Sequence, residues 1–299
     1  MSIPKFLIEK LKAQYDDNLV HEILLGYQSK PVTFRINRLK TTVEEVENFL
    51  QLKGISYQKT SWFEDAFIIE NRVEDDIKSL SIYEDGKIYL QSLSSMLPVL
   101  FLDLQDGQSI LDMAAAPGGK TTEIASLFQD QVLITAVEKN KIRADRLRYN
   151  ITKQGVRRAT VLESDASKLD DYFSFDSILL DAPCSGSGTL LSQNDNLYFK
   201  EELLEKTKRL QRELLRKAVQ VLKPGASMIY STCSILEEEN EVPIENLLKE
   251  NLVEVVPLDF SKIPDIPQLP SKISGAMVVM PSKLYEGFFI VKLRKRKQL

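Results

Sequence analysis

The sequence predicts an α/β fold: a doubly wound, Rossmann-like parallel sheet preceded by a smaller amino-terminal α+β domain. Two observations lead to this class. From about residue 108 onward, short apolar runs alternate with longer amphipathic stretches, which is typical of parallel strands joined by helices. Before residue 88 the elements are shorter and mixed. We therefore expect two domains, residues 1–88 and 89–299.

The amino-terminal module begins with a helical opening. Residues 31–37, PVTFRIN, then predict a strand because they are rich in β-branched and aromatic side chains. Residues 41–54, TTVEEVENFLQLKG, predict a helix that is capped at its start and ends at a glycine. Two further strands are expected at 56–62 and 66–71, which completes a small α+β unit.

The remaining residues predict the parallel sheet. Strands are expected at 108–114, 132–138, 159–166, 175–183 and 226–234. Helices are expected at 120–128, 139–155 and 198–225, the last of them stopped by Pro224 and Gly225. The final apolar run, FFIVKL at 288–293, predicts a last strand that is antiparallel at one edge of the sheet.

Composition narrows the class of protein. Two cysteines in 299 residues form no disulfide framework and suit a reducing cytosol, so a cytoplasmic location is expected. The single histidine, His21, is far from both cysteines in sequence, which argues against a metal cluster. The first 17 residues are charged and contain no long apolar core, so they predict neither a signal peptide nor a membrane span. No membrane partner is expected. A monomer is the default expectation.

Both cysteines stand where a strand gives way to a loop. Cys184 lies in LLDAPCSGSGTL, after the fourth strand of the sheet, and Cys233 lies in IYSTCSIL, after the fifth. Buried free thiols are common as core filler, but filler belongs in the middle of a strand. Ligands of such sheets bind beyond the carboxyl ends of the strands. The positions therefore favour a functional role for both thiols.

The glycine turn after the first strand of the sheet suits a ligand without phosphates. It contains GGKT, the end of a phosphate-binding loop, but Ala114 stands where that loop requires a glycine. Pro117 also removes a backbone donor. Glu138 ends the next strand, where a carboxylate accepts the ribose hydroxyls, and Asp165 ends the third, within reach of an adenine amino group. Together these strand ends fit S-adenosylmethionine.

Six segments between residues 33 and 293 form a recognisable set: TFRINRLKTT, YLQSLSSMLPVL, ILDMAAAPGGKTT, LLDAPCSGSGTL, YSTCSILEEENE and EGFFIVKL. In sequence and in order they resemble the Sun and nucleolar-protein-2 family of RNA cytosine-C5 methyltransferases. The resemblance implies a methyltransferase sheet of the class that uses S-adenosylmethionine, an amino-terminal domain similar to an RNA recognition motif, and an rRNA or tRNA substrate. Ala114 stands where the family often has cysteine, and Glu138 replaces a common aspartate.

The resemblance also implies the site residues. Cys233 would be the nucleophile, Cys184 would assist release of the covalent intermediate, and Asp181 would contact the base. Lys120 would be a structural or active-site hydrogen-bond donor. The residues expected to hold the cofactor are Ala114, Ala115, Ala116, Pro117, Gly118, Gly119, Lys120, Glu138, Arg143, Asp165 and Asp181.

The chemistry explains why two thiols are useful. Carbon 5 of cytosine is a poor nucleophile until a thiolate adds to carbon 6. A free cysteine, with a pKa of about 8.5, needs a suitable environment to ionise. Asp181 would hydrogen-bond the base near N3, which requires a protonated carboxyl and a raised pKa. A second thiol would then aid release of the first. DNA cytosine methyltransferases use the proline-cysteine thiol as nucleophile, so the two roles could be reversed.

Contacts with RNA are expected from Arg35, Asn37 and Lys40 and from the basic helix 139–158. Residues 292–297, KLRKRK, form a second basic island. Three other functions stay open from sequence: a DNA cytosine methyltransferase, a nucleotide hydrolase built on GGKT, and an RNA-binding assembly factor without activity. Intact Asp181, Cys184 and Cys233 speak against the last.

Overall fold

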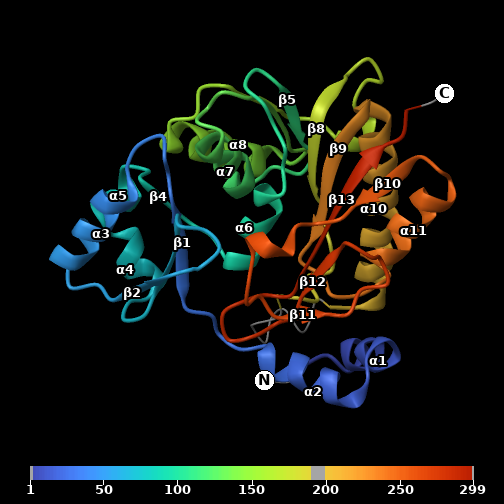
Figure 1. Ribbon diagram of the computed structural model, residues 1–299, viewed down its shortest axis with the longest axis horizontal. Coiled ribbons are helices and arrows are strands. Elements are labelled where there is room, and N and C mark those ends of the chain that lie inside the picture. The colour runs from blue at the N-terminus through green and yellow to red at the C-terminus, as the bar shows by residue number, and fades with distance from the viewer. Residues whose placement is uncertain (1–2, 190–198, 298–299) are drawn as a thin grey trace. The chain divides into compact units, whose positions relative to one another are not determined.

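The structure is a computed structural model that describes residues 3–189 and 199–297 (Figure 1). The chain divides into two compact units. Unit 1 comprises Met1–Lys30, Ser167–Leu258 and Ile266–Leu299, and unit 2 comprises Pro31–Ala166 and Asp259–Asp265. Among the described residues, unit 1 holds six strands and unit 2 holds seven.

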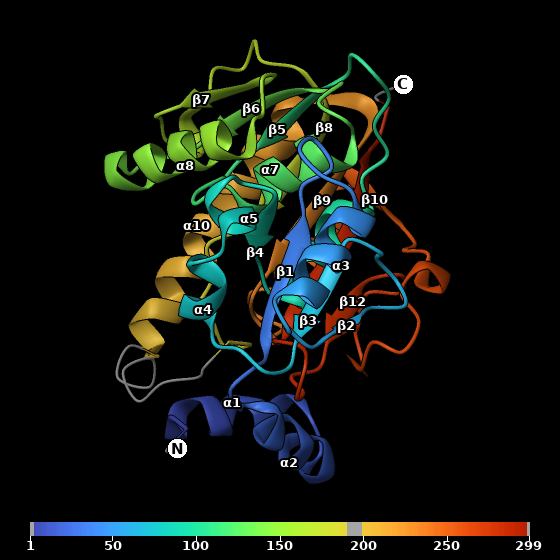
Figure 2. The same ribbon diagram turned by 90° about the vertical axis from the view of Figure 1, so that its left-hand side faces the viewer.

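Unit 2 begins with a four-stranded antiparallel sheet in the order β2-β3-β1-β4 (Figure 2). Along the chain its elements follow the βαββαβ pattern of a ferredoxin-like fold, which confirms the predicted α+β domain. In its core the rings of Phe34 and Phe67 stack with centroids 5.1 Å apart. The elements are β1 (Val32–Ile36), α3 (Val43–Leu52), β2 (Tyr57–Lys59), β3 (Ala66–Ile69), α4 (Glu74–Lys78), α5 (Ser81–Glu84) and β4 (Ile88–Leu90).

The start and the end of α3 follow the sequence signals. The Thr42 hydroxyl accepts a hydrogen bond from the Glu45 amide, so this residue caps the helix. Gly54 has a φ of 62°, a left-handed conformation that ends helices at low cost for glycine. Buried Val46 and Leu50 face the sheet's core cluster. The predicted helix is thus confirmed, with its ends inside the expected range.

Unit 2 continues with three parallel strands in the order β5-β6-β7. Helix α7 connects β5 to β6, and α8 connects β6 to β7. This is the predicted alternation of strands and helices, and it brings the carboxyl ends of all three strands to one edge. The elements are α6 (Leu93–Leu100), β5 (Ser109–Asp112), α7 (Gly119–Leu127), β6 (Leu133–Val137), α8 (Lys141–Gln154), β7 (Ala159–Leu162) and the short 3-10 helix η2 (Phe260–Lys262).

Unit 1 contains a mixed set of strands. β8 and β9 pair in parallel, β13 pairs antiparallel with β9, and β12 and β11 follow antiparallel in turn. β10 also pairs with β13. The elements are α1 (Lys5–Gln14), α2 (Asp17–Gly26), η1 (Ala166–Lys168, which begins at the unit boundary), β8 (Phe175–Asp181), α10 (Glu201–Val221), β9 (Leu222–Thr232), α11 (Glu241–Lys249), β10 (Val253–Val256), β11 (Gln268–Leu269), β12 (Met277–Val279) and β13 (Phe288–Lys295).

Helix α10 buries one face, which includes Leu204, Leu214 and Ala218. The prediction for this helix was wrong at its carboxyl end, because Leu222 already pairs with Phe175 as the first residue of β9. Pro224 and Gly225 lie within β9, where its register against β8 shifts and an irregular strand tolerates proline. Tyr198, in the predicted helix start, lies outside the described residues. Among the described helices, none has the length and apolar character needed to cross a membrane.

The last strand is antiparallel, as predicted, but the expected edge position is wrong. β13 has β9 on one side and both β12 and β10 on the other. Strands β10, β11 and β12 are too short to show a clear alternation of apolar and polar residues, and the sequence did not predict them. Full burial of β13 from Phe288 to Leu293 agrees with this interior position.

Candidate active site

The two cysteines of unit 1 come together beyond the ends of β8 and β9. These strands pair in parallel up to Asp181 opposite Ser231, so the loops that follow them start side by side. The Sγ atoms of Cys184 and Cys233 are 2.8 Å apart, and both residues are half-buried. The sequence placed both thiols at strand ends, and the fold turns this into direct contact between two sulfur atoms.

Close backbone contacts hold the cysteine loops. The Gly188 amide donates to the Cys233 carbonyl oxygen at 2.9 Å, and the Gly287 amide donates to the Gly188 carbonyl oxygen at 2.9 Å. A Cβ atom on Gly188 would lie 2.1 Å from the Gly287 carbonyl oxygen, so only glycine fits there. Tyr27, directly after α2, donates from its hydroxyl to the Ser187 carbonyl oxygen. The Cys184 loop is therefore fixed at several points.

The environment makes the two thiols unequal. The hydrogen bond with Cys233, burial, and the nearby Cys233 and Glu239 charges raise the pKa of Cys184 well above its usual range. A thiol with such a pKa keeps its proton at neutral pH. With Cys184 as the donor, the 2.8 Å contact would stabilise negative charge on Cys233.

Asp181 is the last residue of β8, three positions before Cys184. Its Oδ1 accepts a hydrogen bond from the Ser231 hydroxyl on β9 at 2.8 Å. The carboxyl group is partly exposed and lies at the same strand ends as the two thiols. It is therefore placed on the side of the sheet where a ligand of this fold binds.

Polar groups behind the thiols complete this part of unit 1. The hydroxyls of Ser187 and Ser234 are 2.7 Å apart, and the Ile235 amide donates to Ser187 Oγ at 3.0 Å. Asn240 accepts from the Thr232 hydroxyl and donates to the Ser234 carbonyl oxygen. No role could be predicted for these residues from the sequence, because serine and asparagine near strand ends are typical of ordinary loops.

In unit 2 the residues from Ala114 to Lys120 form the turn between β5 and α7. The peptide bond from Ala116 to Pro117 is cis, and Gly118 has a φ of 109° as the residue before the helix. A side chain at Gly118 would be strained by this backbone and would meet the Leu147 side chain at 3.0 Å. The Ala115 amide donates to the Val137 carbonyl oxygen at 3.0 Å. The turn thus has one defined shape.

Helix α8 braces this turn through its side chains. Arg143 donates from Nη2 to the Ala116 carbonyl oxygen at 2.8 Å, and Asn150 donates to the Pro117 carbonyl oxygen at 2.7 Å. Arg143 Nη1 also lies 3.3 Å from Oε2 of Glu138. Arg143 therefore ties the glycine turn to the carboxylate at the end of β6.

The predicted cofactor residues of unit 2 share one edge of its parallel strands. Glu138 follows β6, is buried, and accepts a hydrogen bond from the Asn140 amide at 2.8 Å. Asp165 is half-buried and follows β7. Small alanines, a glycine turn and two carboxylates at neighbouring strand ends offer acceptors for hydroxyl and amino groups. This donor and acceptor set fits an adenosine group and would repel a phosphate chain.

Two cations make hydrogen bonds at this turn: Lys120, its last residue, and Arg35 of β1. Lys120 Nζ donates to the Ser95 hydroxyl at 2.7 Å. Arg35 is 1% exposed and donates from Nη2 to the Gly119 carbonyl oxygen at 2.9 Å and to the Thr122 hydroxyl at 2.8 Å. The prediction that Arg35 contacts RNA is wrong, because a cation in a strand pattern does not reveal which face of the sheet it occupies.

Two of the three residues predicted to grip RNA are therefore corrected. Arg35 is buried, as above, and Asn37 is fully buried, where its amide donates to the carbonyl oxygens of Gly86 and Gln154. Both hold unit 2 together. Lys40 is exposed, but its ammonium group donates to the carbonyl oxygens of Asp85 and Lys153. In the predicted basic helix, Lys141, Arg146 and Arg148 are exposed.

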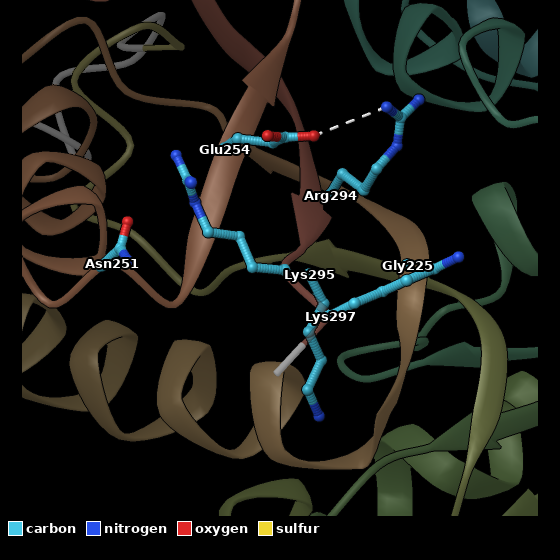
Figure 3. Close-up of a pocket in the computed structure, with 7 residues that line it drawn as sticks. Gly225, Asn251, Glu254, Arg294, Lys295 and Lys297 are labelled. Carbon is cyan, nitrogen blue, oxygen red and sulfur yellow. Dashed lines mark ion pairs between the residues drawn. The ribbon is translucent and has the colours of Figure 1, made fainter. Parts of the chain in front are cut away.

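The second basic island lines a hollow of about 770 Å³ in unit 1 (Figure 3). Arg294 forms an ion pair with Glu254 at 3.5 Å, and Lys295 donates to the carbonyl oxygens of Gln220 and Leu222. The hollow includes Gly225, near the first residue of β9, whereas Cys233 follows the last. It is therefore separate from the thiol pair.

Comparison with known proteins agrees with these sites. A family profile described as 16S rRNA methyltransferase RsmB/F matches residues 99–294. The chain belongs to this family. A second profile, the ferredoxin-like domain of the same methyltransferases, matches residues 3–74. The family match confirms the resemblance predicted from the sequence motifs, and membership of this methyltransferase family supports S-adenosylmethionine as the cofactor.

Individual relatives cover the chain almost completely. The ribosomal RNA small subunit methyltransferase F of Vibrio vulnificus (strain YJ016) is 34% identical over 98% of this chain. The chain spans 64% of the length of that relative. A crystal structure of a methyltransferase homolog from Pyrococcus horikoshii is 31% identical, with a TM-score of 0.80 over 98% of this chain and 100% of the other. NSun6 of the same organism, solved with SFG, has a TM-score of 0.87 at 23% identity over 99% of each chain, and shows the common fold.

Proposed function

We propose that the protein transfers a methyl group from S-adenosylmethionine to carbon 5 of a cytidine in small-subunit rRNA, through a transient bond between Cys233 and carbon 6. The observation that carries this proposal is the pair of sulfur atoms, 2.8 Å apart at the ends of two parallel strands. A methyltransferase that leaves its base uncoupled from sulfur has no use for such a pair. The rRNA substrate is supported by the names of the family and of its relative from Vibrio vulnificus.

The cofactor would be held by the turn from Ala114 to Lys120 together with Glu138, Arg143, Asp165 and Asp181. Glu138 would accept the ribose hydroxyls, and Asp165 would accept the adenine amino group. Arg143 would hold the turn and Glu138 in fixed positions relative to each other, since it contacts both. When bound, S-adenosylmethionine supplies an electrophilic methyl group on a sulfonium centre.

Cys233 would start the reaction as a thiolate. Its sulfur adds to carbon 6 of the cytosine, and the electron pair of the carbon 5–carbon 6 double bond moves to carbon 5. Cys184 would stabilise the thiolate beforehand by donating its proton in a hydrogen bond, which its raised pKa favours. Asp181 would hold the base near N3 and the exocyclic amine. Carbon 5 is then electron-rich and takes the methyl group.

Release of the product breaks the bond between Cys233 and carbon 6. The proton on carbon 5 passes to water, and the electron pair of that carbon–hydrogen bond restores the double bond and expels Cys233 as a thiolate. Cys184 would aid this step by donating a hydrogen bond to the departing sulfur. Lys120, whose ammonium contacts Ser95, would act as a support of the turn. The target base must be presented outside a stack, which costs least for an unpaired nucleotide.

We further propose that residues 1–88 act mainly in RNA recognition and residues 89–299 in catalysis. With Arg35 and Asn37 assigned to the interior, the remaining candidates for contact with the RNA backbone are Lys40 and the exposed cations of α8, Lys141, Arg146 and Arg148. The protein is proposed to act as a monomer in the cytoplasm.

The test is transfer of a radioactive methyl group to purified small-subunit rRNA, followed by bisulfite sequencing of the product. We expect label in rRNA and a new 5-methylcytosine at a single position. Parallel reactions with tRNA and with DNA separate the alternatives. Label at an atom other than carbon 5, or label in DNA or tRNA alone, would refute the proposed reaction or its substrate.

A further inference from the structure

A buried carboxylate behind the cysteine loops has no part in the reaction described so far. Glu239 lies six residues after Cys233 and is fully buried. Burying a carboxylate costs several kcal/mol unless hydrogen bonds replace the lost water. Its neighbours in the sequence are placed differently: Glu238 pairs with Lys10 at 2.7 Å, and Glu237 pairs with Lys272. Of the three consecutive acids at 237–239, Glu239 is therefore the one whose side chain is fully buried.

Four hydrogen bonds converge on the Glu239 carboxylate. The Ser185 amide donates to Oε1 at 2.8 Å, and the Ser185 hydroxyl donates to Oε2 at 2.5 Å. From α10, the Thr207 hydroxyl donates at 2.6 Å and the Gln211 amide at 3.3 Å. All four donors are neutral groups, so none of these hydrogen bonds brings a cation to the carboxylate.

These contacts enclose Cys184 on both sides. Ser185, directly after it, is bound by Glu239. Pro183, directly before it, accepts at its carbonyl oxygen from Gln211 at 3.0 Å, and Gln211 also contacts Glu239. The Tyr230 hydroxyl donates to the backbone oxygen of Glu239 at 2.6 Å, which anchors the carboxylate to β9, the strand that carries Cys233. Glu239 thus contacts the Cys184 loop through its side chain and β9 through its backbone oxygen.

We propose that Glu239 is a positioning residue that decides which of the two sulfurs keeps the shared proton. Its carboxylate fixes the 183–185 segment so that Cys184 Sγ rests against Cys233 Sγ, and its negative charge disfavours a second negative charge on Cys184. Cys184 then stays a neutral hydrogen-bond donor, and Cys233 becomes the thiolate. The consequence for catalysis rests on the proposed function, whereas the assignment of the proton does not.

Other titratable groups face the same region. Cys184 and Asp181 approach from β8 and its loop, and Tyr230 and Cys233 approach from β9 and its end. Burial, with Glu239 as a further cause, raises the pKa of Tyr230, so its hydroxyl stays neutral through the range in which thiols ionise. α10 contributes Thr207 and Gln211, which do not titrate.

The experiment measures which thiol is alkylated first. The full chain is treated with limiting iodoacetamide at a series of pH values between about 6 and 10, and the two cysteine peptides are quantified by mass spectrometry; the range brackets the ordinary thiol pKa. Four proteins are compared: the native chain, Glu239→Gln, Glu239→Asp and Glu238→Gln. Glu239→Gln removes the charge and keeps the shape, and Glu239→Asp keeps the charge. Glu238→Gln makes the same change of charge one residue away.

We expect Cys233 to be labelled first in the native chain and in Glu238→Gln. Glu239→Gln should lower the preference for Cys233 about tenfold and move the labelling midpoint of Cys184 to lower pH by roughly one unit, since a nearby negative charge has been removed. Glu239→Asp should keep the preference. If Glu239 only held the Cys184 loop in place and its charge had no effect, Glu239→Gln and Glu239→Asp would lose the preference for Cys233 to the same extent.

An unchanged preference in Glu239→Gln, or an equal loss in Glu239→Asp, overturns the inference. If Glu239→Gln does not fold, the preference in Glu239→Asp still decides, because its loss contradicts a role for the charge. The labelling uses neither RNA nor cofactor. Failure of methyl transfer to carbon 5 would therefore refute the proposed function and leave this result intact, and the converse outcome would refute only the role of Glu239.

Discussion

The thiol region of unit 1 and the glycine turn of unit 2 are built in opposite ways. In the thiol region the atoms proposed to react are the side-chain sulfurs of Cys184 and Cys233, and buried polar groups such as Glu239 and Ser187 lie around them. At the turn the shape of the backbone matters, and Arg143 and Arg35 reach it by donating to its carbonyl oxygens. We propose that the first region controls which thiol keeps its proton, whereas the second region fixes the shape of the backbone. Substitutions in the two regions should therefore change different properties of the protein.

The largest expected effect comes from the nucleophile. Cys233→Ser replaces the thiol by a hydroxyl that does not ionise near neutral pH, so methyl transfer should fall by at least about a thousandfold. Binding of S-adenosylmethionine, measured by calorimetry, should be unchanged, because the cofactor is assigned to other residues. Activity within tenfold of the native chain would show that position 233 does not carry the reaction.

A buried acid makes the stability of unit 2 depend on pH. Burial, opposed by Arg35 and Gln91, raises the pKa of Glu123 to about 8 from an ordinary 4.5. The folded state then holds the proton more tightly than the unfolded chain. The associated stability is complete below about pH 4.5 and is lost as the pH rises through about 8.

Urea unfolding between pH 5 and pH 9 checks this. The free energy of unfolding should drop by roughly 2–4 kcal/mol across that range, and Glu123→Gln should remove most of the drop. Glu163→Gln, an exposed change in the same unit, should retain it. An equal pH dependence in Glu123→Gln and the native chain would assign the loss to other groups.

A smaller effect tests the bracing of the turn. Arg143→Met removes the hydrogen bond to the Ala116 carbonyl oxygen and the contact with Glu138. We expect the dissociation constant for S-adenosylmethionine to rise about tenfold, the cost of one charged hydrogen bond. Arg148→Met is the matched control on the same helix, because Arg148 pairs with Asp145 and Glu163 on its surface. Equal affinities in the two variants would contradict the role of Arg143.

Strand ends explain why much of this site could be predicted. Parallel strands deliver the residues that follow them to one edge of the sheet, so Cys184, Cys233 and Glu138 could be assigned functional positions from their place after apolar runs. The glycine turn carried its own local signal. These predictions needed only the order of elements along the chain.

Contacts between distant segments explain what could not be predicted. Arg35 stands among alternating residues of β1, and nothing in TFRIN reveals that its guanidinium is buried against the glycine turn. Glu239 is one of several acids in EEENE, and only packing against α10 distinguishes it from the half-buried Glu237 and Glu238. Burial of a single polar residue depends on partners far away in sequence, which composition and periodicity do not encode.

The proposed roles of the two thiols, attack by Cys233 and release by Cys184, are tested most directly by trapping the covalent intermediate. Cys184→Ala and Cys233→Ala are each incubated with small-subunit rRNA and S-adenosylmethionine, and the products are separated on a denaturing gel. We predict a slowly migrating protein–RNA adduct with Cys184→Ala, since release is impaired while attack proceeds, and none with Cys233→Ala. An adduct that forms with Cys233→Ala but not with Cys184→Ala would reverse the assignment of nucleophile and contradict the account.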